Sequence, residues 1–236
     1  MLPLRDINPT RRFPIMNYAI ILINVLVFLW ELSLSPDQLD AGLARLAVVP
    51  AIASAHPFAL PTILSIIRSM FFHAGWAHLL GNMLYLYLFG DNVEDRLGWI
   101  MYLILYFGSG FAAAWAQIAI DPSSTIVLVG ASGAIAGVLG SYFLFFPRVR
   151  VKGIVPLVFI GLWAEWPAWL VIGLWFLVQL FNGVASVGVA TAGGGVAFFA
   201  HIGGFLFGLF LTRLVMMVYP PPPAPDRYEM LYRRAG

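Results

Sequence analysis

The chain has 236 residues, of which 61% are hydrophobic and only 10% are charged, and its formal net charge is +2. Soluble domains carry about 25% charged residues, so this composition excludes an ordinary soluble domain and indicates a protein of the lipid bilayer. The small net charge argues against a nucleic-acid partner. The absence of Cys excludes disulfides, thiolate nucleophiles and cysteine metal ligands.

Six apolar stretches are candidates for membrane-spanning helices, because a helix needs about 20 mainly apolar residues to cross a bilayer. They cover residues 15–34, 78–90, 99–120, 126–146, 167–182 and 193–217, and the second is short. Residues 35–77 are partly apolar, but every possible span is interrupted by Pro50, Pro57, Pro61, Arg45 or Arg68, so we expect a structured loop at the membrane interface. The predicted fold is all-α, a polytopic membrane protein built as a six-helix bundle.

The predicted organisation has three parts: an N-terminal segment (1–14), a membrane domain (15–217) and a proline-rich tail (218–236). With six spans, both termini lie on one side, and eleven of the thirteen basic residues fall on that side, all but Arg45 and Arg68. Since basic loops stay in the cytoplasm, we expect cytoplasmic termini, in a bacterial cytoplasmic membrane. Predicted spans two, four and six then all enter from the outer face.

Three polar residues fall at a similar depth in this topology. His78 opens the second span, Ser132 is near the start of the fourth, and His201 is about eight residues into the sixth. An ionisable residue inside a span is costly, and a functional role is its default interpretation. A buried structural histidine and a helix-packing serine remain the alternatives. His56 and His73 fall in the long loop, where we interpret them as solvated or interfacial.

Helical spacing brings Ser132 and His201 onto facing stripes of small residues. Ser132 shares a helix face with Ala136 and Gly140, and His201 shares one with Gly204. Small stripes let two membrane helices approach closely, so the serine and the histidine could come within hydrogen-bond reach. A serine hydroxyl needs such a base to act as a nucleophile. Plain helix packing explains the glycines but gives no reason for the histidine.

The sequence favours a Ser–His dyad over a triad, because no acidic residue is found at the same depth. An acyl-transfer site also needs donors for the oxyanion. His78 and Asn82 are four residues apart and share a face of the second predicted span. Taken alone, His78 is interpreted equally well as an interfacial residue, and Asn82 as a residue that hydrogen-bonds to another helix. Together with the Ser–His pair, the two are better explained as an oxyanion hole.

The stretches "GASGAIAG", "AHIGG" and "HAGWAHLLGNM" closely resemble the rhomboid family of intramembrane serine proteases, from about Arg68 to Phe210. The resemblance implies a six-helix bundle that cleaves transmembrane protein substrates with no metal or cofactor. It implies Ser132 as the nucleophile, His201 as the general base, and His78 and Asn82 as the oxyanion side chains. The stretch "GDNVEDRLG" also resembles the family, and we expect a structural role for it.

Two departures from the family pattern stand out. Some members carry a Tyr four residues after the nucleophile, whereas this chain has Ala136, so His201 must be held differently; the first loop also has no clear Trp-Arg motif. The resemblance points to span five and a cap, the glycine-rich residues 184–195, as the gate for substrate. Four tryptophans are available to line the gate or to anchor it at the interface: Trp163, Trp166, Trp169 and Trp175. A transporter or channel and an inactive helix-binding relative are the rival functions, and the oligomeric state is open.

Overall fold

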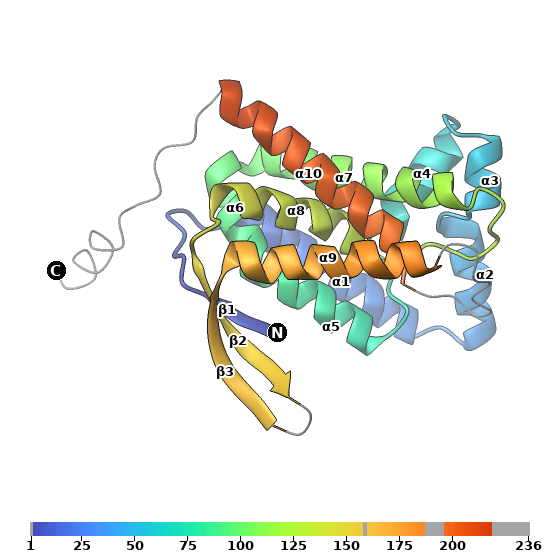
Figure 1. Cartoon of the computed structure of the whole chain (residues 1–236). Coiled ribbons are helices and arrows are strands. Elements are labelled where there is room, and N and C mark those ends of the chain that lie inside the picture. The colour runs from blue at the N-terminus through green and yellow to red at the C-terminus, as the bar shows by residue number, and fades with distance from the viewer. Residues whose placement is uncertain (1, 158–159, 187–195, 219–236) are drawn as a thin grey trace.

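The computed structural model describes residues 2–157, 160–186 and 196–218. Three helices pack together at the centre of the bundle: α7 (Trp99–Ile120), α8 (Ser132–Phe145) and α10 (Phe198–Val218). Around them lie α1 (Ile15–Leu32), α5 (Trp76–Tyr85) and α9 (Ala168–Ser186) (Figure 1). Three short helices, α2 (Pro36–Leu46), α3 (Pro50–Ala55) and α4 (Leu60–Ser69), gather at one end, and α6 (Asp91–Leu97) lies at the other.

Among the described residues, four helices are long and apolar enough to cross a membrane: α1, α7, α9 and α10. The bounds of α7 coincide with the predicted span 99–120. Helix α5 continues through a π-helical turn (Leu86–Gly90) into α6, and α8 has only 14 residues. The count of six spans depends on these shorter helices and stays a prediction. The expected proline-rich tail, and residues 187–195 of the expected cap, lie outside the described residues.

The expected interfacial loop, 35–77, contains the three short helices rather than irregular chain. A proline stands in the first turn of each, at Pro36, Pro50 and Pro61. Proline is well suited to this place, because the N–H groups of the first turn have no partner inside the helix. Helix α2 also has a capping box between Ser35 and Gln38. Two of the prolines that rule out a long span here, Pro50 and Pro61, therefore serve as starts of short helices.

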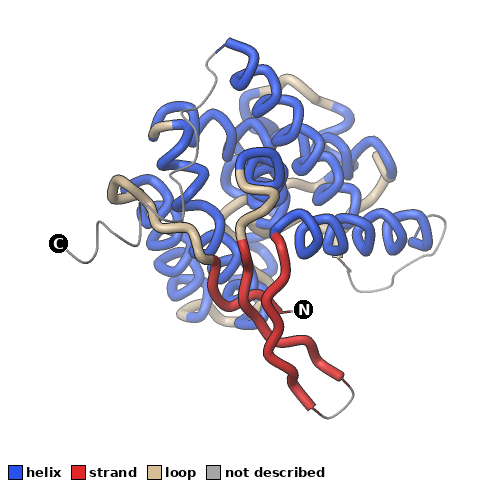
Figure 2. Tube along the Cα trace, turned by 60° about the vertical axis from the view of Figure 1, so that its left-hand side comes forward, coloured by secondary structure: helices blue, strands red, loops and turns tan. Residues whose placement is uncertain are grey.

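The all-α prediction was wrong in one respect, because the chain also forms a three-stranded antiparallel sheet. Its order is β1 (Leu2–Asp6), β2 (Arg150–Leu157) and β3 (Ile160–Pro167), and it projects from the helix bundle (Figure 2). Burial alternates along the start of β2, where Val151 is buried and Lys152 is exposed, which is the period of a strand. The pairing of residues near the N-terminus with residues 151–154 is long-range, so no local pattern predicts it.

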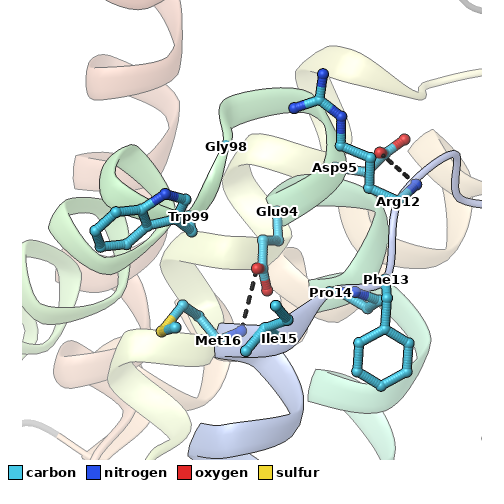
Figure 3. A pocket seen from close by; sticks show the side chains of 9 residues that line it. All are labelled: Arg12, Phe13, Pro14, Ile15, Met16, Glu94, Asp95, Gly98 and Trp99. Atoms are coloured by element: carbon cyan, nitrogen blue, oxygen red, sulfur yellow. Dashed lines mark hydrogen bonds between the residues drawn. The ribbon is translucent and has the colours of Figure 1, made fainter.

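The stretch "GDNVEDRLG" fastens the start of α1. This helix has no side-chain N-cap of its own. Instead, the Glu94 carboxylate accepts hydrogen bonds from the backbone N–H groups of Met16 (3.1 Å) and Asn17 (2.7 Å) (Figure 3). The Asp95 carboxylate similarly accepts from the N–H of Arg12, at 3.1 Å. The two Glu94 bonds satisfy N–H groups that the first turn of a helix leaves free, which agrees with the structural role expected of the motif.

At the same end of the bundle, the sheet contacts the last turns of α8. The Tyr142 hydroxyl donates a hydrogen bond to Asp6 Oδ2, at 2.8 Å. Burial of the Asp6 carboxyl raises its pKa from 3.8 to about 7, because desolvation penalises the charged form more than the tyrosine bond favours it. Asp6 thus carries a proton over much of the acidic range when the chain is folded.

Helices α8 and α10 meet backbone to backbone along a seam of glycines. A Cβ added to Gly204 would collide with the carbonyl of Gly133, and one added to Gly208 would collide with the backbone of Gly137. A Cβ on Gly140 would lie 2.5 Å from the carbonyl oxygen of Phe205. Only residues without a side chain permit this approach. The seam runs directly toward the ends of α8 and α10 that carry Ser132 and His201.

Candidate active site

Ser132 is the first residue of α8, and an extended segment leads into it. Two backbone bonds tie this segment to the 35–77 region: Leu128 N–H donates to the Val48 carbonyl and Gly130 N–H to the Ser69 carbonyl, both at 2.8 Å. Gly130 has φ 123°, which favours glycine, and a Cβ there would lie 2.6 Å from the ring of His78. The turn at Gly130 explains why α8 begins later than predicted from its apolar sequence.

His201 lies in the first turn of α10 and faces Ser132. Its Nε2 is 2.8 Å from Ser132 Oγ, a hydrogen-bond distance. The two residues are 69 positions apart in the chain, and the glycine seam brings their helices together. An anchor from α7 holds the start of α10, because the backbone N–H of Ala200 donates to Gln117 Oε1 at 3.3 Å.

His78 and Asn82 lie on α5, on the side that faces Ser132. The backbone N–H of Ala74 donates to His78 Nδ1 at 3.4 Å, so a neutral His78 carries its proton on Nε2. That nitrogen points toward Gly130. The Asn82 amide is buried, and its Nδ2 has no hydrogen-bond partner in the described part of the chain. The structure therefore places two side-chain N–H donors in the wall of the cavity that Ser132 also lines.

The four predicted site residues line one cavity of about 990 Å³. The cavity lies between α5, the extended segment 126–129 and the starts of α8 and α10, and it also touches Asp40 and Leu43 of α2. Trp175 of α9 forms part of its wall. The cavity is therefore at the α2–α4 end of the bundle, away from the sheet.

Position 136 is Ala rather than Tyr, and His201 is held instead by two residues of α9. Ala136 is fully buried. The indole of Trp175 lies near the imidazole of His201, with ring centroids 5.8 Å apart at 36°. One turn later on the same helix, Gln179 Oε1 is 2.8 Å from His201 Nδ1. The polar Gln179 inside an apolar predicted span was the signal that could have found this contact.

The four tryptophans expected at the gate do not lie together in the structure. Trp163 and Trp166 lie on β3, at the opposite end of the bundle from the cavity, and Trp169 lies in the first turn of α9 near the sheet. Of the four, Trp175 is the one that lines the cavity. Nothing in the sequence indicated that residues 160–167 form a strand, which places Trp163 and Trp166 away from the cavity. Anchoring of these tryptophans at the membrane interface stays a prediction.

His73 is buried, not interfacial as predicted. Its backbone N–H donates to both carboxylate oxygens of Glu31, at 3.2 Å each, and its Nδ1 donates to the carbonyl of Phe71 at 3.2 Å. Its ring meets that of His78 edge to face, 5.1 Å apart. Burial lowers the pKa of His73 to about 4, so it stays neutral at pH 7 and adds no charge beside His78.

These features define a class of protein: a membrane protein with a serine hydroxyl hydrogen-bonded to a histidine inside its helix bundle, beside a cavity with N–H donors. The Rhomboid domain profile matches residues 61–218, a range that includes Ser132, His201, His78 and Asn82. The chain belongs to the rhomboid family, a family of intramembrane serine proteases.

Curated relatives from several kinds of organism match the same region. Rhomboid protein 1, mitochondrial, of Saccharomyces cerevisiae is 30% identical over 160 residues, covering 64% of this chain and 43% of that protein. RHOMBOID-like protein 4 of Arabidopsis thaliana is 34% identical over 148 residues, covering 63% and 32%. Rhomboid protease AarA of Providencia stuartii is 29% identical over 163 residues, covering 64% and 55%. The matches thus span about half or less of these relatives.

Proposed function

We propose that this chain is an active serine endopeptidase that hydrolyses peptide bonds in or near transmembrane segments of membrane proteins. The observation that supports this most directly is the 2.8 Å contact between Ser132 Oγ and His201 Nε2 at the wall of a large cavity. A serine that only packed helices would need no base at this distance. The unpartnered Nδ2 of Asn82 adds a donor to the same space.

The proposed reaction is acyl transfer. Ser132 Oγ attacks the scissile carbonyl carbon as its proton passes to His201 Nε2, and the protonated imidazole then gives that proton to the leaving amine. The negative charge on the carbonyl oxygen is stabilised by Nε2–H of His78 and Nδ2–H of Asn82. Water, activated by the same histidine, releases the acyl group and restores the serine.

We further propose six spans, with α5 and α8 as the short ones, and cytoplasmic termini in a bacterial cytoplasmic membrane. The sheet end carries Arg5, Arg148, Arg150 and Lys152, whereas Arg45 and Arg68 lie on α2 and α4 at the cavity end. Basic residues favour the cytoplasmic side, so the cavity opens to the outer side, where water is available. A reporter fused to the C-terminal tail that reads as external would contradict this orientation.

A fluorophosphonate probe on the purified protein tests the activity. Such probes react with activated serines, so mass spectrometry should find the label on Ser132, and Ser132→Ala should take up none there. Cleavage of a transmembrane substrate should be lost in the same variant. The rival functions, a transporter or an inactive helix-binding relative, predict no labelling of Ser132 and no cleavage. A variant lacking Ser132 that still cleaves at the parent rate would refute the proposal.

A further inference from the structure

Gln179 stands directly behind His201 as seen from the cavity. It is buried on α9, 22 residues before the histidine, and its Oε1 is 2.8 Å from His201 Nδ1. The described cavity wall contains Trp175 and His201 but not Gln179. Gln179 is therefore placed to act on the imidazole without touching a substrate.

A second hydrogen bond fixes which end of the Gln179 amide faces the histidine. Its Nε2 donates to the backbone carbonyl of Trp175, at 3.2 Å. The opposite orientation of the amide would place two acceptor oxygens against each other at that carbonyl. Oε1 therefore faces His201, and because an amide oxygen only accepts, Nδ1 of His201 must carry the proton.

The proton on Nδ1 decides what the other nitrogen of the ring can do. In a neutral imidazole one nitrogen donates and the other accepts, so Nε2 is left with its lone pair. That lone pair lies 2.8 Å from Ser132 Oγ and can take the hydroxyl proton. With the other tautomer, Nε2–H would face the serine and no proton could be accepted. Loss of the correct tautomer is severe in enzymes that use a Ser–His pair.

The face of α9 that carries Gln179 is turned toward α10 over two turns. Trp175 lies one turn earlier and places its indole beside the imidazole. Gly183 lies one turn later, where a Cβ would be 3.3 Å from Ile202 and 3.4 Å from Phe198. Phe181 and Val184 on the other face are largely exposed. The face formed by Trp175, Gln179 and Gly183 is thus the one by which α9 contacts the helix of the histidine.

We propose that Gln179 is a positioning residue that holds His201 in the Nδ1–H tautomer, so that the working unit is Ser132–His201–Gln179 rather than a dyad. This inference rests on the proposed function, because it assigns a partner to the same histidine. The orienting group comes from α9, which neither carries the serine nor belongs to the glycine seam. The base is therefore competent only while α9 is seated against α10.

The test replaces Gln179 and separates turnover from substrate binding. Gln179→Leu keeps most of the volume but removes the acceptor, and we expect kcat to fall about 10- to 100-fold, the effect of one lost buried hydrogen bond. KM should stay near the parent value, because the side chain is outside the cavity. Gln179→Met is a second variant without an acceptor, for use if the leucine variant folds poorly. The measurements are kcat, KM and thermal unfolding on purified protein.

Rescue distinguishes positioning from a merely structural role. Gln179→Glu keeps an acceptor oxygen for Nδ1 of His201, and its second oxygen, when protonated, donates to the Trp175 carbonyl as the amide does. It should therefore be clearly more active than the leucine variant. Ser33→Ala, at the end of α1 and outside the wall of the cavity, removes only a hydroxyl bond to the Trp30 carbonyl and should match the parent. Unchanged kcat in the leucine and methionine variants, or equal losses for leucine and glutamate, would overturn the inference.

The fluorophosphonate probe keeps the two proposals apart. If the parent protein is labelled at Ser132 and the leucine variant is labelled more slowly, both proposals are supported. If the parent is labelled and the variant reacts at the same rate, the role of Gln179 is refuted while the protease stands. If the parent is not labelled at Ser132, the proposed function itself is refuted.

Discussion

Replacing Gly208 with alanine tests whether the glycine seam sets the distance between the serine and the histidine. Gly208 lies on α10 about two turns from His201, so it touches neither site residue. A Cβ at this position would lie only 2.6 Å from the Cα of Gly137, and the obstacle is backbone that has no flexible side chain to move. Helices α8 and α10 must therefore separate.

The size of the separation follows from the same contact. An ordinary Cβ contact is 3.4–4 Å, so relief from 2.6 Å requires a shift of at least about 1 Å, and the carbonyl oxygen of Gly137 is closer still. If the helices move apart by that amount, the 2.8 Å distance between Ser132 Oγ and His201 Nε2 lengthens beyond hydrogen-bond range. A 1 Å misplacement at a reacting pair costs about 10² in rate, and overpacking costs about 1–3 kcal/mol of stability.

The assay compares Gly208→Ala with Gly173→Ala, a matched change on α9. At Gly173 an added Cβ would be 3.8 Å from the ring of Phe143, an ordinary contact. We expect kcat/KM for a transmembrane substrate to fall about 100-fold for the first variant and to stay near the parent value for the second. A Gly208→Ala protein with the parent's activity and melting temperature would show that the seam does not fix the site geometry.

Three further outcomes are expected. Ser132→Ala and His201→Ala should each abolish cleavage, and the double variant should be no worse because the two residues act as a unit; additive losses would contradict this. Asn82→Ala should retain some activity, reduced about 10²–10³-fold, because it removes only one oxyanion donor. Glu94→Gln leaves one N–H of α1 without an acceptor, at a cost of about 1–3 kcal/mol, so the melting temperature should fall by several degrees while kcat is unchanged. Because the pKa of Asp6 is raised from 3.8 to about 7, its stabilising contribution is complete below about pH 3.8 and is lost as the pH rises to about 7. Asp6→Asn should flatten that part of the pH–stability curve, and parallel curves for parent and variant would refute the assignment.

Much of the helical architecture could be predicted from local sequence. The apolar run 99–120 ends where Gly98, at φ 76°, and Asp121 break the helix, so its bounds coincide with α7. The 78–90 and 126–146 predictions located helices but not their starts. The predicted span 126–146 starts too early because hydropathy does not show that residues 126–130 are non-helical. Backbone bonds to Val48 and Ser69 hold this segment in place.

Sequence could predict the site residues that share a helix face or lie on a stripe of small residues. It could not predict the contacts that other parts of the chain make with them. His78 and Asn82 share a helix face by spacing alone, and small residues around Ser132 and His201 favoured a close approach of their helices. Gln179 reaches His201 from a separate helix, and sequence offered only its polarity as a sign. The buried His73 owes its place to Glu31, a contact over 42 residues that no local pattern contains.

The backbone bonds that join the segment before Ser132 to the 35–77 region have a consequence for how the candidate site is lost. Gly130 N–H reaches the Ser69 carbonyl, Leu128 N–H reaches the Val48 carbonyl, and Val48 N–H in turn reaches Ser69 Oγ, each at 2.8 Å. If the chain around Val48 or Ser69 opens, these amides lose their partners at once. The short helices α2–α4 and the serine therefore belong to one cooperative unit. A single protease nick among those helices would displace Ser132 without removing any residue of the candidate site.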